Sequence, residues 1–248
     1  MKRALLTVSF GTSYSDADQE CIRPVEAALA AAFPAFECRR AFTSRFIVRK
    51  LRAQGIDIED EAEAIRRLRN DGYADIRIVS THIIHGAEYE RIIKTAGELP
   101  VSEPLLETEE DLRWLAGLLG GIARAEGRTL LAMGHGTEHA ADETYARLRA
   151  KLPENVYLAC VEGAHALEGI LPQLDALPEK KLVLMPLMLV AGDHAHNDLA
   201  GDGPASWKSI LEARGFDVRI RMQGLGALEA VQQRFVSKVA NLMRPRCR

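Results

Sequence analysis

The sequence predicts an α/β protein built from two similar three-layer α/β/α halves, each with a parallel sheet. Strand-like and helix-like segments alternate along the 248 residues, which is typical of parallel sheets covered by helices. The run 182–190 is apolar throughout, as expected for a strand that is buried on both faces and continues into an apolar loop. Two stretches of the first half match two stretches of the second half, which indicates a duplicated unit.

The internal match covers a strand and a loop in each pair of stretches. Residues 5–12 align without gaps on 130–137, and residues 75–88 align on 181–194. A duplication of this kind predicts about four parallel strands with flanking helices in each half.

The alignment also predicts the domains and the place of the site. We expect an N-terminal domain at 1–125 and a C-terminal domain at 126–248, with a last helix that can pack back on the first domain. Ligands of open parallel sheets bind beyond the carboxyl ends of the strands. We therefore expect the active site in the cleft between the two domains.

Local periodicity and capping residues define the elements of the first half. Helical apolar spacing stops before Pro34, and Thr43-Ser44 is typical of a helix N-cap. Pro104 demotes the last apolar stretch to a weak edge strand, because proline cannot donate to a ladder. The expected strands are 3–9, 36–42, 76–80 and 101–107, and the expected helices are 16–32, a basic helix after Ser44, 59–70, one ending near 98, and one starting at 108–111.

The second half repeats this order. Apolar segments again end at glycine, and helical spacing follows each of them. The expected strands are 129–133, 156–161, the start of the run 182–190, and 217–222, and the expected helices are one ending near 151, 166–177, one starting near 206, and 227–243.

Composition argues against several classes of partner. Lys and Arg number 32 against 35 for Asp and Glu, and the net charge of −3 does not suggest nucleic acid or an anionic membrane as a partner. No apolar stretch approaches the about 20 residues of a spanning helix, and the first residues enter a strand instead of a leader peptide, so we expect a cytoplasmic protein. Cys21, Cys38, Cys160 and Cys247 are scattered, which argues against a structural zinc site and a disulfide framework.

No nucleotide cofactor is expected. The sequence has no Gly-x-x-x-x-Gly-Lys phosphate loop, and its two Gly-x-Gly pairs lack the third glycine of a dinucleotide fingerprint. It also has no Gly-x-Ser-x-Gly nucleophile motif.

Two histidines and one glutamate follow predicted strands of the second half. His135 lies between two glycines, Glu162 ends the next strand, and His194 follows the apolar run. Each histidine alone could be structural, but the two at matching strand ends favour a functional role. Two imidazoles and one carboxylate with open positions suit a borderline divalent ion such as Co²⁺, Fe²⁺, Ni²⁺ or Zn²⁺.

The remaining paired histidines have simpler interpretations. We expect His139 at the surface or behind the site, and His196 exposed. His82 and His85 flank two isoleucines, so a partly buried histidine with satisfied hydrogen bonds is the expectation for them.

Several motifs occur together along nearly the whole chain. They are Val8–Tyr14 (VSFGTSY), Arg40–Ser44 (RAFTS), the segment 82–90, and the longest one, 185–195 (MPLMLVAGDHA). This set resembles the small ATP-independent class II tetrapyrrole chelatases, and within them the anaerobic cobaltochelatases of cobalamin biosynthesis (CbiK type). The resemblance implies two similar α/β domains and insertion of Co²⁺ into sirohydrochlorin.

The resemblance also implies roles for individual residues. It implies catalytic roles for His135, Glu88 and His194, and metal binding by His135, Glu162 and His194. Sirohydrochlorin carries many carboxylates around an apolar ring, so basic and apolar residues are expected to contact it. The residues expected to bind the substrate are Phe10, Gly11, Thr12, Ser13, Arg45, His82 and Leu189.

Three functions are compatible with these residues. The first is a cobaltochelatase, for which Co²⁺ is the substrate metal and Fe²⁺ or Ni²⁺ are alternatives because of the extra imidazoles of His85 and His196. A sirohydrochlorin ferrochelatase of siroheme synthesis, or a non-catalytic haem or metal carrier, is the alternative. The third is a generic metal-dependent hydrolase. A homo-oligomer is also compatible with the sequence.

Overall fold

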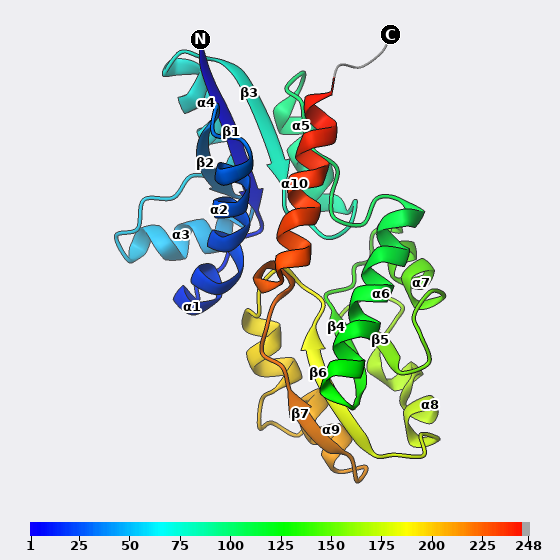
Figure 1. Ribbon diagram of the computed structural model, residues 1–248. Helices are drawn as coiled ribbons and strands as arrows, with labels where there is room; N and C mark the ends of the chain where they lie inside the picture. Colours follow the sequence, from blue (N-terminus) through cyan, green and yellow to red (C-terminus); the bar gives the residue numbers. More distant parts are fainter. Residues whose placement is uncertain (245–248) are drawn as a thin grey trace. The chain divides into compact units, whose positions relative to one another are not determined.

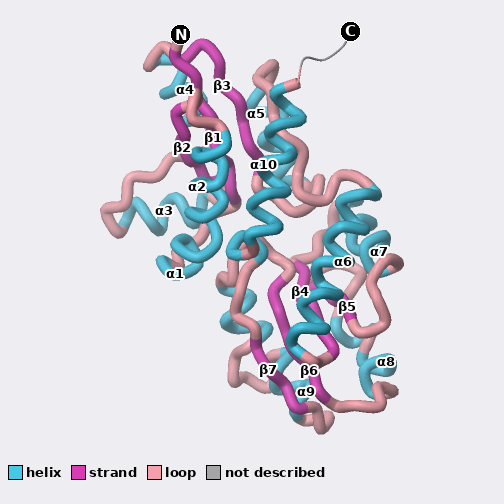
Figure 2. The backbone as a smooth tube through the Cα atoms, viewed as in Figure 1, coloured by secondary structure: helices cyan, strands magenta, loops and turns pink. Residues whose placement is uncertain are grey.

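Two separate parallel sheets contain the strands of the computed structural model, which describes residues 1–244 (Figure 1). The first sheet has the strand order β2-β1-β3, and the second has the order β5-β4-β6-β7. The magenta strands in Figure 2 fall into the same two groups, and every neighbouring pair within them is parallel. This arrangement, with helices around each sheet, confirms the predicted α/β class.

The elements have the following bounds. The strands are β1 (Lys2–Ser9), β2 (Glu37–Phe42), β3 (Tyr73–Ser80), β4 (Thr129–Gly134), β5 (Val156–Cys160), β6 (Lys181–Pro186) and β7 (Asp217–Ile220). The helices are α1 (Ser15–Ala17), α2 (Arg23–Ala32), α3 (Arg45–Ala53), α4 (Glu61–Asn70), α5 (Ala87–Ala96), α6 (Glu109–Glu126), α7 (Glu143–Arg149), α8 (Leu171–Asp175), α9 (Trp207–Glu212) and α10 (Glu229–Met243). Within residues 1–244, no helix combines the length and the apolarity needed to cross a bilayer.

The chain divides into two compact units. Unit 1 is Met1–Leu105 together with the described residues from Gly226 onward, and unit 2 is Leu106–Leu225. The boundary lies before α6, whereas the sequence placed it after this helix. α6 belongs to unit 2 because it contacts β4 and β5, and α10 belongs to unit 1 because it packs against α2.

The register of the strands follows the internal match. Val8 of β1 pairs with Ser80 of β3, and Met133 of β4 pairs with Pro186 of β6. The ungapped alignment equates these same positions, Val8 with Met133 and Ser80 with Pro186. The duplication therefore extends from the sequence to the pairing of the strands.

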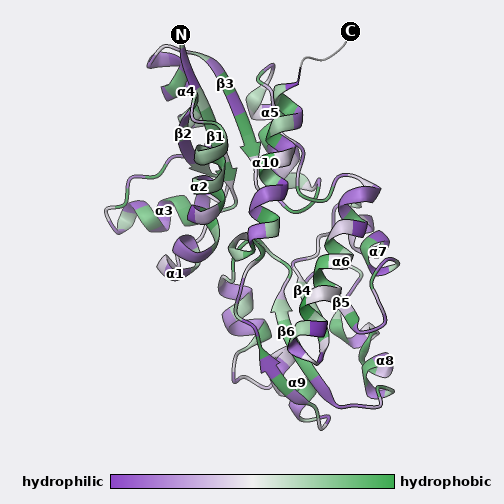
Figure 3. Ribbon diagram, in the orientation of Figure 1, coloured by the Kyte–Doolittle hydropathy of each residue, from purple (hydrophilic) through white to green (hydrophobic). Residues whose placement is uncertain are grey.

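Apolar residues of the strands contribute to the cores. Figure 3 shows that β3 changes from purple to green along its length, so its carboxyl-terminal half is the hydrophobic half. Ile78 and Val79 are inaccessible there, and in β6 the residues from Leu182 to Leu184 are inaccessible as well. Burying each such side chain contributes about 1.5–3 kcal/mol to folding.

Capping residues start the helices where the sequence predicts. Ser44 accepts a hydrogen bond from the Ile47 amide at the start of α3. Thr108 and Asp111 form a reciprocal capping box at the start of α6. Both starts are confirmed, because each cap satisfies an amide that the helix leaves without an internal partner.

The predicted fourth strand of the first half, 101–107, is wrong. Only an isolated bridge joins Val101 to Ile78, so the first sheet has three strands among the described residues. Pro104 has no amide hydrogen to continue the ladder. The next amide, of Leu105, donates instead to the carbonyl of His82 at 2.9 Å.

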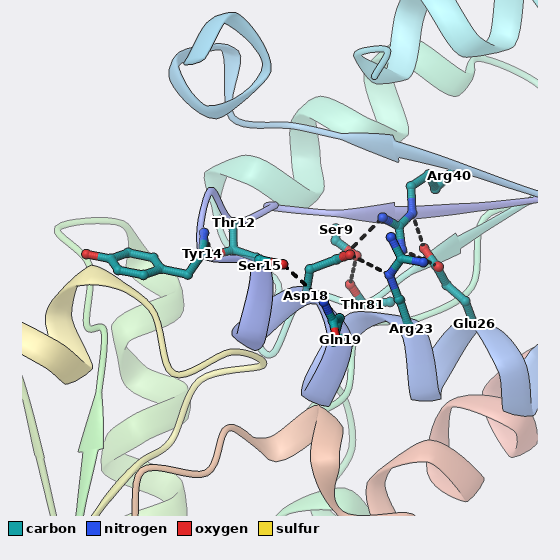
Figure 4. A network of polar contacts seen from close by, with 10 residues as sticks. All are labelled: Ser9, Thr12, Tyr14, Ser15, Asp18, Gln19, Arg23, Glu26, Arg40 and Thr81. Atoms are coloured by element: carbon teal, nitrogen blue, oxygen red, sulfur yellow. Dashed lines mark hydrogen bonds and ion pairs between the residues drawn. The ribbon is translucent and has the colours of Figure 1, made fainter. Parts of the chain in front are cut away.

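The predicted helix 16–32 contains a π-helical turn at Asp18–Ile22 between α1 and α2. Proline removes an amide donor and crowds the preceding turn, and Pro24 lies two residues after the end of this turn. Figure 4 shows Arg40 of β2 reaching this segment. Its guanidinium donates to Asp18 at 3.0 Å and to Glu26 at 2.9 Å, which ties the turn and α2 to the sheet.

Candidate metal-binding site

The three predicted metal-binding residues follow neighbouring strands of the second sheet. His135 comes directly after β4, Glu162 follows β5, and His194 lies in the segment after β6. β4 lies between β5 and β6 in the sheet. The backbone pairing continues beyond the strands, because the Glu162 amide donates to the His135 carbonyl at 2.8 Å. All three residues therefore lie at the carboxyl edge of one sheet, as predicted.

The side chains of these residues lie close together. The ring centroids of His135 and His194 are 4.9 Å apart, and the ring planes are nearly perpendicular at 89°. The carboxylate oxygen Oε2 of Glu162 lies 3.8 Å from Nδ1 of His135. Within residues 1–244, however, no three His, Cys, Asp or Glu side chains are arranged to hold one metal ion together. The three-residue metal site stays a prediction.

In each of the two histidines, the Nδ1 atom has a hydrogen-bond partner. Nδ1 of His135 lies 3.0 Å from the Gly136 carbonyl oxygen, and Nδ1 of His194 lies 2.7 Å from Oδ2 of Asp198. Because both partners accept, the neutral rings carry their proton on Nδ1 and keep a lone pair on Nε2. The side chains are 45% and 33% exposed, so each ring can offer a neutral nitrogen ligand.

Packing explains the two glycines that flank His135. A Cβ atom on Gly136 would lie 1.9 Å from the Glu162 carbonyl oxygen, and the φ angle of +79° also favours glycine. A Cβ atom on Gly134 would lie 2.9 Å from the sulfur of Cys160. The glycines let the loops after β4 and β5 pass in contact, which brings His135 beside Glu162.

Cys160 lies beside this site but is a poor ligand. Burial, with a smaller contribution from the nearby Asp142 charge, raises the pKa of its thiol to about 12. A thiol that stays protonated at neutral pH neither binds metal well nor reacts as a nucleophile. Cys21, Cys38 and Cys160 form no disulfide, and Cys247 lies outside the described residues.

Asp198 is a site residue that the sequence interpretation missed. Its bond to His194 spans a π-helical turn, Ala195–Leu199. The available signal was the spacing of four residues, which places two side chains on one face of a helix. A carboxylate on the second nitrogen of a metal-binding histidine fixes the ring orientation and raises its basicity.

His139 has a structural role. The predicted helix after the Gly-His-Gly motif begins only at Glu143, and a short 3₁₀ turn, Ala140–Asp142, precedes it. Nδ1 of His139 accepts from the Ala141 amide at 3.1 Å and so caps this turn. His196 is exposed, as expected.

The loop after β1 holds four of the predicted substrate residues. Phe10 is 50% exposed, which is unusual for an aromatic side chain in this protein. Gly11 has a φ angle of +97°, and a Cβ atom there would lie 2.6 Å from the ring of Phe42. Thr12 is buried and accepts from the Tyr14 amide at 3.1 Å (Figure 4), and Ser13 is half-buried.

Arg45 and His82 lie near this loop at the carboxyl edge of the first sheet. The amide of Ser44, which precedes exposed Arg45, donates to the Phe10 carbonyl at 3.1 Å. Nδ1 of His82 lies 3.0 Å from the Ser80 hydroxyl. Burial, followed by the charge of Arg91, lowers the pKa of His82 to about 4, so this ring is neutral at physiological pH. Leu189 is half-buried in the segment after β6, in unit 2.

Glu88 lies in the first turn of α5, in unit 1. Both of its oxygens accept from Arg91, at 3.1 and 2.9 Å. Arg91 also donates to the buried carboxylate of Glu61 at 3.0 Å and to the Thr43 carbonyl. The sequence interpretation missed this arginine, although its spacing of three residues from Glu88 was the available signal.

The matching family model and the curated relatives point to one family. The family model for cobalt chelatase (CbiK) matches residues 3–244. A sirohydrochlorin cobaltochelatase of Salmonella typhimurium is 38% identical over 252 residues, which cover 96% of this chain and 95% of that protein. Sirohydrochlorin cobaltochelatase CbiKC of Nitratidesulfovibrio vulgaris is 32% identical over 229 residues, which cover 86% of this chain and 81% of that protein. A glucose-galactose binding protein from Geobacillus stearothermophilus gives a TM-score of only 0.46 at 10% identity, over 98% of this chain and 90% of that chain.

Proposed function

Because the chain belongs to the cobalt chelatase (CbiK) family, we propose that it is an enzyme that inserts Co²⁺ into sirohydrochlorin without ATP. Two relatives that match most of the chain carry the name sirohydrochlorin cobaltochelatase. The observation in the structure that best supports this proposal is the pair of His135 and His194, whose Nε2 atoms have no hydrogen-bond partner among the described residues.

The chemistry of insertion suits two histidines. The reaction replaces two pyrrole protons by one dication, so the protein must release the metal and accept protons near neutral pH. A neutral imidazole binds borderline ions, and its unperturbed pKa of about 6.5 makes it a usable base. We therefore assign His135 and His194 to metal delivery and deprotonation, with Glu162 as the carboxylate beside His135.

Glu88 is the proposed acceptor of the second proton. The register of the two sheets equates its position with that of His194, because Val8–Ser80 and Met133–Pro186 are equivalent pairs. Its carboxylate is held by Arg91, so it enters the reaction from a fixed orientation. An active site shared by both units stays a prediction from the sequence.

The substrate contacts follow from the chemistry of the tetrapyrrole. Exposed Arg45 offers a guanidinium for a carboxylate side chain of sirohydrochlorin, and exposed Phe10 offers an aromatic surface for the ring. The backbone of Gly11, Thr12 and Ser13, together with His82 and Leu189, completes the proposed set. The cytoplasmic location, a homo-oligomeric state and the use of Fe²⁺ or Ni²⁺ stay expectations of the same proposal.

An anaerobic absorbance assay tests the function. Sirohydrochlorin is mixed with Co²⁺, Fe²⁺ or Ni²⁺ in parallel reactions, each with and without protein and without nucleotide. We expect the protein to form more than one equivalent of cobalt product, faster than the reaction without protein. Faster turnover with Fe²⁺ would favour a siroheme-forming enzyme, and product limited to one equivalent per protein would indicate a carrier.

The variant Glu88→Gln tests the proton role on the same assay. It keeps the shape of the side chain but removes the base, so kcat should fall roughly 10²-fold while Co²⁺ affinity barely changes. If Glu88 only compensates the helix start, the variant should lose about 0.3–1 kcal/mol of stability and keep a normal kcat. A normal kcat with a lowered melting temperature would remove Glu88 from the mechanism.

A further inference from the structure

Asp142 joins the two loops that carry His135 and Glu162. Its Oδ1 atom accepts from the Thr137 amide, in the loop after β4, at 3.3 Å. Its Oδ2 atom accepts from the Ala164 amide, in the loop after β5, at 3.1 Å. One carboxylate therefore bonds to the backbone of both loops, two residues beyond each predicted metal-binding residue.

Gly163 makes this arrangement possible. A Cβ atom at Gly163 would lie 2.8 Å from Oδ1 of Asp142 and 2.8 Å from the Thr137 carbonyl oxygen, and its φ angle is +79°. Together with Gly136, whose Cβ would overlap the Glu162 backbone, it shows that the loops approach each other at two points. Asp142 lies at the second of these points.

Asp142 also contacts the side chain of His165. Nε2 of His165 lies 3.7 Å from Oδ2 of Asp142, and both side chains are shielded, with exposures of 15% and 14%. Nδ1 of His165 lies 3.0 Å from NH1 of Arg149 at the end of α7. Because the guanidinium donates to Nδ1, the proton of a neutral His165 is on Nε2, which faces Asp142.

We propose that Asp142 is a positioning residue that fixes the distance between His135 and Glu162 and so sets the affinity of the site for a divalent ion. The inference rests on the proposed function only in taking these two residues as metal ligands. Supporting residues of this kind change metal affinity or activity by about 10–100-fold when they are removed. A purely structural aspartate would change the melting temperature and leave the affinity of the folded protein intact.

Anaerobic Co²⁺ titrations of the full chain test this role, followed by the visible absorption of the bound ion, which depends on its ligands. We expect Asp142→Ala to weaken Co²⁺ binding by about 10–100-fold and to alter the absorption spectrum. Asp142→Asn keeps one accepting oxygen but places an amide group near one backbone N–H, so its loss should be smaller. Asp175→Ala is the matched control, because it removes an exposed carboxylate of the same unit that pairs with Arg214.

Each outcome separates this inference from the proposed function. Wild-type affinity in both Asp142 variants, together with lost affinity in His135→Ala, would overturn the positioning role and leave the metal site intact. Wild-type protein that binds no Co²⁺ would overturn the metal site and the positioning role together. Circular dichroism and melting curves identify a variant that fails to fold. If Asp142→Ala does so, a wild-type affinity in folded Asp142→Asn overturns the inference.

Discussion

Asp198 illustrates how one supporting residue can orient a candidate metal ligand, His194. The carboxylate of Asp198 accepts the Nδ1 proton of His194 at 2.7 Å, which leaves Nε2 available as a ligand. At the residue scale, motifs made of His and Gly were predictable from the sequence because they interrupt apolar strands. Their supporting carboxylates were not, because Asp142 and Asp198 act through contacts that form only when loops and turns are folded.

Replacement of Asp198 by Asn tests this support. The amide keeps the size of the side chain but loses the charge and one of the two accepting oxygens, so the ring of His194 should be less well oriented. We expect Co²⁺ affinity or turnover to fall about 10–100-fold with little change in melting temperature. Calorimetric titration with Co²⁺ and kcat on the same sample provide the measurement, and wild-type values for both would contradict a supporting role.

His82 should make stability depend on pH. Its pKa is about 4 in the folded protein, below the usual 6.5, because of burial and the charge of Arg91. Between these two values the unfolded chain binds more protons, so stability falls as the pH falls through this window. The expected loss between pH 7 and pH 5 is about 2 kcal/mol.

Urea unfolding at both pH values, on wild type and His82→Asn, isolates this contribution. The wild type should lose about 2 kcal/mol more than the variant over this interval, since the carboxylates contribute equally to both. Parallel pH profiles for the two proteins would show that His82 titrates normally.

At the scale of elements, strands and helix caps were the most predictable features. The run that starts at Leu182 predicts β6, because an uninterrupted apolar segment is typical of a strand that is buried on both faces of a parallel sheet. The predicted strand 101–107 was wrong because a single proline ends the ladder there. The π-helical turn at Asp18–Ile22 was not predicted, since the periodicity of apolar residues hardly distinguishes it from an α-helix.

Arg40 should stabilise the packing of this turn on β2. Its side chain is 26% exposed, and its partners Asp18 and Glu26 are 15% and 20% exposed. Arg40→Met removes the guanidinium that bridges the two carboxylates, and leaves Asp18 with Arg23 alone, so we expect a loss of about 2–3 kcal/mol in the free energy of unfolding. Arg214→Met is the matched control, because its pair with Asp175 is 41% exposed on both sides and should cost less than about 1 kcal/mol.

Chemical denaturation of both variants at pH 7 measures the two losses. Equal losses in Arg40→Met and Arg214→Met would show that the network around the turn adds nothing beyond an ordinary surface ion pair.

At the scale of the whole molecule, duplication explains how one fold carries two kinds of residue at equivalent places. The loop after the first strand bears Phe10 in unit 1 and His135 in unit 2, and Glu88 corresponds to His194. The fold class and the family were accessible from the sequence because the repeat and the motifs extend along most of the chain. The division before α6 was not predictable. The apolar spacing of a helix between two repeats does not indicate which of the two sheets the helix covers.

The most direct measurement of the central claim combines turnover and Co²⁺ affinity in His194→Ala, with His196→Ala as the matched control. Both variants remove an imidazole from the same segment, but only His194 lies beside His135 and bonds to Asp198. We expect His194→Ala to lose at least about tenfold in Co²⁺ affinity and in cobalt insertion into sirohydrochlorin, and His196→Ala to behave like the wild type. Wild-type affinity and turnover in His194→Ala would contradict the assignment of metal delivery to this site.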